Sequence, residues 1–255
     1  MSPGSSFYDQ SAYPLRFEWG EAAIRYLAPL RQAVVIVDVL SFSTAVDVAL
    51  GRGASVWPYR WKDDSAALYA AEHGAVLASH DRRFADGYSL SPASLSTLPR
   101  GARLVLPSPN GATLSLLAQQ TGAAVFTACF RNTGAVAAYI EQHFECVLLV
   151  AAGERWPDGT LRPAREDEWG AGAVIAALNM PASPEAQAAA DAYRAVQANL
   201  LASVTACSSG RELVERGFAG DLNWACDLNV SRAVPLLSDM AYLDADRHGP
   251  PILRV

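Results

Sequence analysis

The chain has 255 residues, of which 51% are hydrophobic and 18% are charged, and its formal net charge at pH 7 is −6. This composition is typical of a folded globular protein and excludes an extensively disordered chain. The negative net charge gives no general attraction to nucleic acid or to an anionic membrane surface, so we expect neither as a partner.

The cysteines and the N-terminal residues indicate the compartment. Cys129, Cys146, Cys207 and Cys226 form no CxxC pair and show no zinc-ligand spacing, so we expect neither a disulfide framework nor a zinc site. Residues 1–13 lack the basic and apolar regions of a secretory signal, and no apolar run of 18 residues occurs. We therefore expect a cytoplasmic protein.

Strand patterns alternate with helix patterns along most of the chain. The predicted strands cover residues 15–19, 34–39, 54–59, 75–79, 103–106, 124–128 and 146–152, with a last strand within 241–255. The predicted helices cover residues 21–30, 43–51, 63–73, 113–120, 131–143 and 184–206, with two more opening near Glu166 and Ser209. This alternation predicts an α/β fold in three layers, α/β/α, with a mainly parallel sheet and a helical C-terminal quarter. We expect one compact unit over residues 1–255, or two α/β lobes with a boundary near residues 100–125.

An aspartate follows a fully apolar run at one of the predicted strands. Residues 33–37 are all apolar and mostly β-branched, which indicates a strand buried on both faces. Asp38 comes directly after this run, and a helix follows a turn rich in serine and threonine. Open α/β sheets bind their ligands at this end of a central strand. The alternative is that Asp38 only caps the following helix.

Four strand-to-helix junctions carry polar side chains: residues 38–44, 108–113, 131–133 and 154–167. In a parallel sheet such junctions lie at one edge, so we expect these groups to converge. Helix N-termini offer free N–H groups and a positive dipole end, which suit phosphate or sulfonate. The side chains of Ser108, Asn110 and Thr113 add donors there, and Arg131 and Arg155 offer bidentate contacts to an oxyanion.

Each of these features has an alternative explanation. Asn110-Gly111 could form an ordinary turn, and Arg131 could simply neutralise nearby carboxylates. The acidic run Glu166-Asp167-Glu168 favours a helix start electrostatically, but this explains only one or two of its members. Asp38 together with Glu166 or Asp167 could instead hold Mg²⁺, which favours a few carboxylates plus waters and substrate oxygens.

Familiar phosphate chemistries do not fit the chain. It contains neither a Walker loop nor a GxGxxG loop after a strand. The spacing from Cys207 to Arg211 is too short for the tyrosine-phosphatase pattern. Leu40 stands where an aspartyl-phosphate enzyme would carry its second aspartate.

Several short segments form a recognisable combination, in order, over residues 33–240. They are Val35-Ile-Val-Asp-Val-Leu40, Pro107-Ser-Pro-Asn-Gly111, Phe130-Arg-Asn-Thr-Gly-Ala-Val-Ala137, Ala152-Gly-Glu154, Glu166-Asp167 with Gly170-Ala-Gly172, Ser209-Gly-Arg-Glu-Leu213, Gly220-Asp-Leu, Asp227-Leu-Asn-Val-Ser231 and Val234-Pro235. In these segments the chain resembles the 2-phosphosulfolactate phosphatase family. One departure is Ser41, which stands where family members usually have an arginine.

The resemblance implies an α/β fold and an Mg²⁺-dependent acid phosphatase. Enzymes of this family hydrolyse 2-phospho-3-sulfolactate to 3-sulfolactate on a route to coenzyme M. Carried over by motif, the resemblance places Asp38, Asn110, Glu166 and Asp167 at the site, and Arg82 through a weaker motif match. Attack on phosphorus by water and attack by a carboxylate are both compatible with these residues.

Together, motifs and resemblance assign roles to individual residues. We expect catalytic roles for Asp38, Asn110, Arg131 and Glu154. We expect substrate contacts from Ser43, Thr44, Arg82, Ser108, Gly111, Asn132 and Arg155. The expected Mg²⁺ ligands are Asp38, Glu166 and Asp167. The expected partner is a small anionic phosphorylated substrate, and a homodimer is one expected form of the protein. The alternatives are a catalytically inactive anion-binding protein of the same fold and a hydrolase of another small phosphorylated metabolite.

Overall fold

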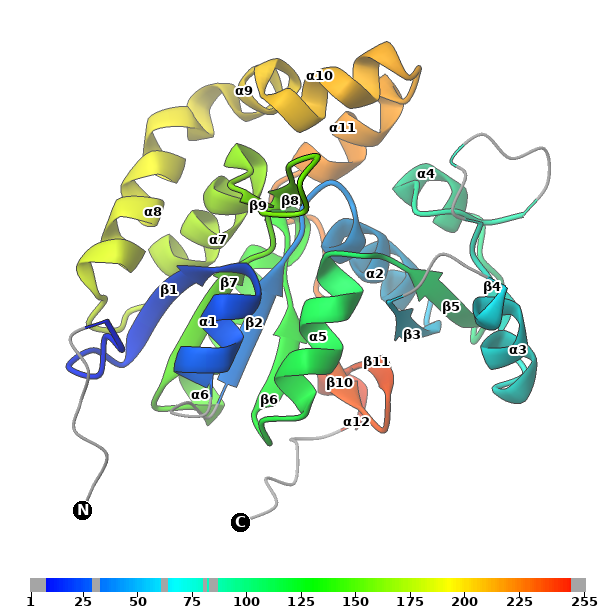
Figure 1. Ribbon diagram of the computed structural model, residues 1–255, viewed down its shortest axis with the longest axis horizontal. Helices are drawn as coiled ribbons and strands as arrows, with labels where there is room; N and C mark the ends of the chain where they lie inside the picture. The colour runs from blue at the N-terminus through cyan, green and yellow to red at the C-terminus, as the bar shows by residue number, and fades with distance from the viewer. Residues whose placement is uncertain (1–7, 29–32, 61–63, 80–81, 83–86, 249–255) are drawn as a thin grey trace.

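The computed structural model describes residues 8–28, 33–60, 64–79, 82 and 87–248 (Figure 1). Residues 29 and 30 of the helix predicted over 21–30 lie outside these ranges. The strands of the main sheet are β1 (Leu15–Trp19), β2 (Ala33–Val37), β3 (Ser55–Tyr59), β4 (Val76–Leu77), β5 (Arg103–Pro107), β6 (Ala124–Thr127), β7 (Val147–Ala151), β10 (Pro235–Ser238) and β11 (Ala241–Asp244). A separate hairpin pairs β8 (Glu154–Arg155) with β9 (Leu161–Arg162).

The main sheet consists of two parallel blocks joined by an antiparallel hairpin. Its strand order is β1-β7-β2-β6-β10-β11-β3-β5-β4. Neighbouring strands run parallel in β1-β7-β2-β6 and in β3-β5-β4. The hairpin β10–β11 pairs antiparallel with β6 on one side and with β3 on the other. The predicted α/β fold with a mainly parallel sheet is therefore confirmed. The lobe boundary near residues 100–125 stays a prediction.

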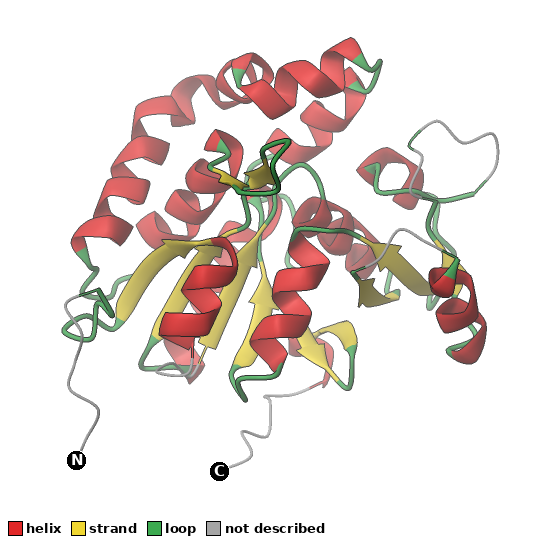
Figure 2. Cartoon of the chain, in the orientation of Figure 1, coloured by secondary structure: helices red, strands yellow, loops and turns green. Residues whose placement is uncertain are grey.

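Helices cover both faces of the sheet (Figure 2). They are α1 (Gly20–Leu27), α2 (Phe42–Gly51), α3 (Ser65–Glu72), α4 (Pro92–Leu95), α5 (Gly111–Gln119), α6 (Thr133–His143), α7 (Arg165–Ala177), α8 (Pro184–Val196), α9 (Leu200–Ala206), α10 (Ser208–Glu215), α11 (Ala219–Cys226) and α12 (Ala245–His248). Short 3₁₀ turns, η2 (Phe130–Asn132) and η3 (Gln197–Asn199), precede α6 and α9. The helix predicted over 184–206 is therefore two helices separated by η3.

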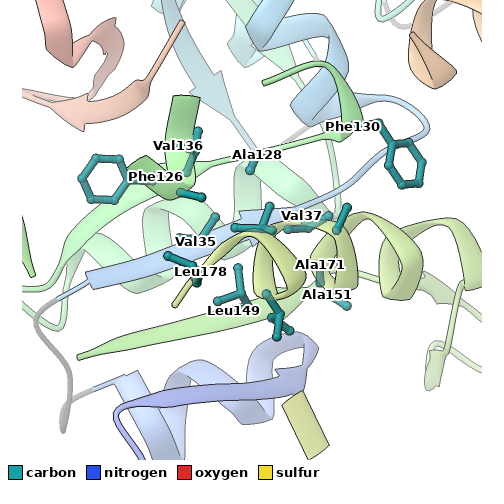
Figure 3. Packing of buried hydrophobic residues seen from close by; sticks show 14 of the residues in the cluster. Val35, Val37, Phe126, Ala128, Phe130, Val136, Leu149, Ala151, Ala171 and Leu178 are labelled. Atoms are coloured by element: carbon teal, nitrogen blue, oxygen red, sulfur yellow. The ribbon is translucent and has the colours of Figure 1, made fainter. Parts of the chain in front are cut away.

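Strand β2 is buried on both faces, as its apolar run predicts. Val35 and Val37 belong to a core formed with α6, α7 and α8 (Figure 3). Val34 and Ile36 belong to a second core, formed with α1, α2 and α5. Successive side chains of a strand point to opposite faces of its sheet, so β2 lies in the middle layer of the predicted three-layer arrangement.

Two glycines bring α7 close to its neighbours. A Cβ atom at Gly170 would lie 2.5 Å from Val39 Cγ2, and one at Gly172 would lie 2.0 Å from the Ala189 carbonyl oxygen. Any larger residue at either position would force α7 away from the loop after β2 or from α8. This close packing places the acidic first turn of α7 against the end of β2.

The C-terminal helices lie over the carboxyl ends of the strands. In Figure 1, α9, α10 and α11 form an arch above the tips of β7 and β2, on the same side as the β8–β9 hairpin. This confirms the predicted helical C-terminal part. Within the described ranges no helix is both long and apolar enough to cross a membrane.

Candidate active site

Asp38 ties together the starts of two helices. It follows β2 directly and is 7% exposed. Its Oδ2 accepts a hydrogen bond from the Gly111 N–H at 2.8 Å, and its Oδ1 accepts one from the Phe42 N–H at 3.3 Å. A Cβ atom at Gly111 would lie 2.3 Å from the Phe42 ring, so only glycine allows this approach. Asp38 thus caps α2 and α5 at once, which joins two of the predicted junctions.

Asp167 joins the loops that follow two neighbouring strands. Its Oδ1 accepts the Val39 N–H at 2.7 Å, and its Oδ2 accepts the Gly153 N–H at 2.8 Å. Val39 lies just beyond β2 and Gly153 lies just beyond β7, strands that pair in parallel. The first turn of α7 is therefore fixed at the same sheet edge as Asp38.

Glu154 and Asn110 connect a third pair of segments. Asn110 Nδ2 donates to Glu154 Oε2 at 3.1 Å. Both residues line a cavity of about 150 Å³, together with Trp19, Arg155 and Leu161 among others. Of the four site carboxylates (Asp38, Glu154, Glu166 and Asp167, hereafter the acid cluster), Glu154 is the one that borders this cavity.

Glu166 is held by a cysteine that the sequence patterns did not indicate. The carboxylate is buried, with 2% of the residue exposed. The Cys207 thiol donates to Glu166 Oε2 at 3.2 Å and also lies 3.0 Å from the Val204 carbonyl oxygen. Burial, followed by the charge of Glu166, raises the pKa of Cys207 to about 12. The thiol therefore keeps its proton and acts as a donor rather than as a nucleophile.

Burial and neighbouring carboxylate charges raise the pKa of Asp38 and of Asp167. Burial raises the pKa of Asp38, and the Glu166 charge adds to this, while the hydrogen bonds from Gly111 and Phe42 oppose it. Burial and the charges of Glu166 and Asp38 raise the pKa of Asp167 well above its usual range. Like charges this close in a buried site disfavour ionisation unless a cation joins them.

Glu154 has a pKa suited to proton transfer. Burial and then the Asp38 charge raise the pKa of Glu154 to about 7, although the hydrogen bond from Asn110 opposes the rise. A carboxyl group with a pKa near neutrality can both donate and accept a proton at physiological pH. Perturbed acids gathered at one sheet edge are typical of a functional site.

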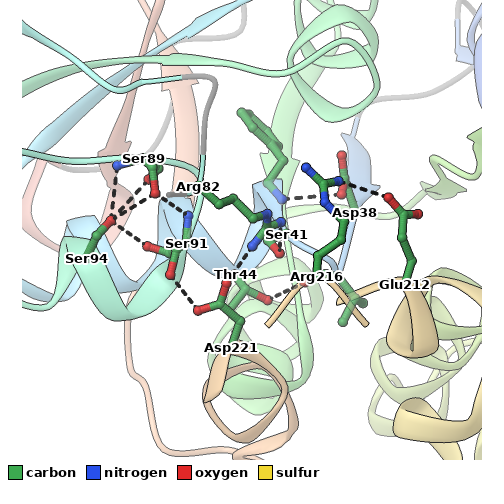
Figure 4. A network of polar contacts seen from close by, with 12 residues as sticks. Asp38, Ser41, Thr44, Arg82, Ser89, Ser91, Ser94, Glu212, Arg216 and Asp221 are labelled. Atoms are coloured by element: carbon green, nitrogen blue, oxygen red, sulfur yellow. Dashed lines mark hydrogen bonds and ion pairs between the residues drawn. The ribbon is translucent and has the colours of Figure 1, made fainter. Parts of the chain in front are cut away.

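Arg82 brings a positive charge to the edge of the acid cluster. Its Nη2 donates to Ser41 Oγ at 2.7 Å, and its Nη1 pairs with Asp221 Oδ2 at 2.5 Å (Figure 4). Burial lowers the pKa of Arg82, and the charges of Asp221 and Asp38 oppose this. Arg82 thus contacts the serine that stands where the family usually has an arginine, and its expected contact with substrate stays a prediction.

The hydroxyls of Ser43 and Thr44 are used within the fold. Ser43 Oγ accepts the Asp38 N–H at 2.8 Å and lies 2.7 Å from Thr127 Oγ1. Thr44 Oγ1 donates to the Val39 carbonyl at 2.8 Å. Both residues are fully buried. They shape the loop after β2, and their expected contact with substrate stays a prediction.

Three other predicted substrate contacts lie at different places. Ser108 is buried at the end of β5. Asn132 Oδ1 accepts the Cys129 N–H at 2.9 Å, while its Nδ2 is buried without a partner in the described part of the chain. Arg155 is half exposed and donates to Glu21 at 2.9 Å beside the cavity of Glu154. Arg155 is thus the one of these three that lines the cavity.

Arg131 is occupied away from the acid cluster. Its Nε pairs with Asp47 at 2.9 Å, and its Nη1 reaches Asp227 at 3.3 Å and the Trp224 carbonyl at 2.9 Å. The guanidinium also lies over the Trp224 ring, 5.2 Å from its centroid. These contacts match the alternative in which Arg131 neutralises carboxylates. The arginine of the junction after β6 therefore does not point to the acid cluster.

The acid cluster offers carboxylate oxygens, which are the kind of ligand that a hard divalent cation prefers. Within the described ranges no three His, Cys, Asp or Glu side chains form a ready group of metal ligands. Mg²⁺ usually binds through one or two carboxylates and completes its shell with water and substrate phosphate oxygens. Several buried, mutually repelling carboxylates are compatible with such a site, because a cation would offset their repulsion.

The fold and site define an α/β protein with an acidic site at the carboxyl edge of a parallel sheet, where enzymes of this architecture bind their ligands. Comparison with known proteins gives the family. Residues 25–240 match the family model described as 2-phosphosulpholactate phosphatase. The chain therefore belongs to the 2-phosphosulfolactate phosphatase family, a family of phosphoric monoester hydrolases.

Individual relatives support this assignment. A protein of Gloeobacter violaceus named "Probable 2-phosphosulfolactate phosphatase" is 31% identical over 212 residues, covering 79% of this chain and 86% of that protein. Proteins of the same name from Thermosynechococcus vestitus and Carboxydothermus hydrogenoformans are 29% and 28% identical. They cover 79% and 80% of this chain and 87% and 85% of their own lengths.

Proposed function

We propose that the protein is an Mg²⁺-dependent phosphatase that hydrolyses 2-phospho-3-sulfolactate to 3-sulfolactate and phosphate. The observation that carries this proposal is the acid cluster, in which Asp38 from the junction after β2, and Glu154 and Asp167 from the junction after β7, are tied to one sheet edge by backbone and side-chain hydrogen bonds. Family membership and the names of the relatives support the substrate.

In this proposal each part of the site has a task. Asp38, Glu166 and Asp167 would hold the metal. A bound Mg²⁺ would polarise a phosphoryl oxygen and stabilise the leaving alkoxide. The N-termini of α2 and α5 would contribute a positive dipole end for the phosphate. Glu154, held by Asn110 and with a pKa of about 7, would donate a proton to the leaving oxygen.

Phosphate release tests the proposal. The purified protein is incubated with 2-phosphosulfolactate and with a panel of phosphorylated carboxylic acids, first with Mg²⁺ and then with excess chelator. We expect turnover of 2-phosphosulfolactate that stops on chelation and returns with added Mg²⁺. If the folded protein with metal releases phosphate from none of the esters, the proposed phosphatase activity is refuted. If turnover is undiminished in excess chelator, the proposed Mg²⁺ dependence is refuted.

The expected homodimer and the cytoplasmic location are further proposals. Sedimentation velocity at micromolar concentration measures the first, and fractionation of cells that express the protein measures the second. Neither bears on the chemistry above.

A further inference from the structure

Asp221 of α11 is a buried carboxylate with both oxygens in use, 3% exposed. Its Oδ2 receives Arg82 Nη1 at 2.5 Å, and its Oδ1 receives the Ser91 hydroxyl at 2.5 Å (Figure 4). Ser91 stands at the start of α4, and Arg82 is 139 residues distant from Asp221 in sequence. A carboxylate fixed at both oxygens gives its arginine partner a fixed orientation as well.

The guanidinium of Arg82 is immobilised on several sides. Besides Asp221, it donates to Ser41 Oγ at 2.7 Å and lies over the Phe218 ring, 5.8 Å from the centroid. Only 8% of the Arg82 side chain is exposed. Ser41 closes the turn that begins at Asp38, so this cation lies beside the acid cluster and not among its carboxylates.

A second guanidinium lies nearby. Figure 4 shows Arg216, at the end of α10, extending toward Arg82 and the Asp38 turn, with Glu212 as its ion-pair partner at 2.9 Å. Burial lowers the pKa of Arg82 and the Arg216 charge lowers it further, while Asp221 opposes both. Two guanidinium groups this close repel each other, and an oxyanion between them would relieve that repulsion.

We infer that Asp221 is a positioning residue that holds Arg82 to bind the sulfonate group of the substrate. The inference rests on the proposed function, in which the metal and the helix N-termini take the phosphoryl group. Arg82 contacts Ser41 and Asp221, whereas Glu154 contacts Asn110 and borders the cavity. A guanidinium with partners separate from those of Glu154 suits a second anionic group of the same molecule. Each terminal nitrogen of Arg82 carries a second N–H besides the one donated to Asp221 or to Ser41, and these remaining N–H groups can donate to a tetrahedral oxyanion.

Kinetics with two matched substrates test the inference. 2-Phosphosulfolactate and 2-phospholactate share the phosphoryl and carboxylate groups and differ in the sulfonate. For Arg82→Ala we expect KM for the sulfonated ester to rise about 10- to 100-fold, as for a lost charge-assisted hydrogen bond, with little change for 2-phospholactate. For Asp221→Asn we expect a smaller rise in KM, again for the sulfonated ester and not for 2-phospholactate, with kcat nearly constant.

A double-mutant cycle separates positioning from general support. If Asp221 acts through Arg82, the double variant Arg82→Ala, Asp221→Asn raises KM no further than Arg82→Ala alone. Ser41→Ala removes another contact of Arg82 and should give the same selective rise if Asp221→Asn does not fold. Arg211→Ala, an exposed arginine on α10, is the matched control and should leave both KM values unchanged.

Equal losses on the two substrates, or additive effects in the cycle, would overturn the inference while leaving the phosphatase in place. If the wild-type protein hydrolyses neither ester, the proposed function has failed, and calorimetric titration with 3-sulfolactate decides the inference instead. Binding that Asp221→Asn weakens about tenfold would support the role of Asp221. Equal binding to both proteins, or no binding to either, would overturn it.

Discussion

Two buried charge clusters lie at different points along α2, and they differ in balance. Near its N-terminus is the acid cluster, which has Arg82 at its edge, itself paired with Asp221. Farther along the helix, Asp47 meets Arg131, which also pairs with Asp227. Burying uncompensated charge is costly, whereas a paired charge can be retained for structure alone. In the second cluster (hereafter the balanced cluster) Arg131 offsets the buried charge of Asp47, so a structural role is enough to account for it. The acid cluster holds four carboxylates, and their charge indicates a bound cation or substrate.

The largest expected effect comes from removing Asp38. Asp38→Asn should lower kcat for 2-phosphosulfolactate at least about 1000-fold, because it removes a proposed metal-binding carboxylate from the reacting centre. Thermal stability should fall modestly, because the asparagine side chain keeps one acceptor oxygen for the two N–H groups of Gly111 and Phe42. The loss of one of several like charges offsets part of that cost. Phosphate release and circular dichroism measure the two effects.

Asp47→Asn is the matched control, because Asp47 is also a buried aspartate and lies nine residues after Asp38 in the sequence. It should lower stability and leave kcat of the folded protein within about threefold. Turnover retained by Asp38→Asn would remove Asp38 from the mechanism. Phosphate binding by a wild-type protein without turnover would instead favour the inactive anion-binding alternative.

Breaking the balanced cluster should affect stability rather than catalysis. Arg131→Met leaves Asp47 buried without its partner, which typically costs about 3–5 kcal/mol. Urea unfolding measures that loss, and kcat below the unfolding transition should stay near the wild-type value. A folded Arg131→Met protein whose kcat has fallen about 100-fold or more would establish the catalytic role that the sequence suggested and the contacts do not support.

The sequence predicted the convergence of the acidic residues but could not assign the role of Arg131. The apolar run before Asp38 predicted β2 and its burial, and the shared edge of parallel strands predicted that Asp38, Gly111, Glu154 and Asp167 would meet. Those are consequences of local pattern and sheet geometry. An arginine at a junction can equally serve an anion or a neighbouring carboxylate, so position alone could not assign Arg131.

Other features depend on contacts between distant segments. The roles of Asp221 and Cys207 arise from partners 139 and 41 residues away, and no local spacing encodes them. The hairpin β10–β11 turns through Asp239 and Met240, both with positive φ (46° and 70°), where asparagine and glycine are the usual signal. The sequence therefore predicted a single last strand and not the pair that joins the two parallel blocks.

The acid cluster should also make stability depend on pH. In the folded protein the pKa of Glu154 is raised from 4.5 to about 7, so the folded state binds more protons than the unfolded state between these values. Its stabilising contribution is full below pH 4.5 and is lost as pH rises to about 7, by about 3 kcal/mol at 1.36 kcal/mol per pH unit. Asp38 and Asp167 change in the same direction.

Urea unfolding at pH 5, 6, 7 and 8 measures this dependence. The free energy of unfolding should fall across the series without metal and recover on addition of Mg²⁺, which binds the ionised carboxylates of the folded state. Glu154→Gln should flatten the profile and reduce turnover. A stability that rises steadily from pH 5 to pH 8 without metal would contradict the raised pKa values and with them the imbalance of the cluster.

The smallest expected effect concerns the thiol that holds Glu166. Cys207→Ala removes the 3.2 Å hydrogen bond to Glu166 Oε2, and loss of such a supporting contact typically weakens metal binding about 10-fold or more. A thiol is a weak donor, so we expect the Mg²⁺ concentration for half-maximal activity to rise about fivefold, below that range. Cys207→Ser keeps a donor and should stay near wild type, as should Cys146→Ala. An unchanged Mg²⁺ dependence in Cys207→Ala would mean that Glu166 does not bind the metal through this geometry, leaving Asp38 and Asp167 as its carboxylate ligands.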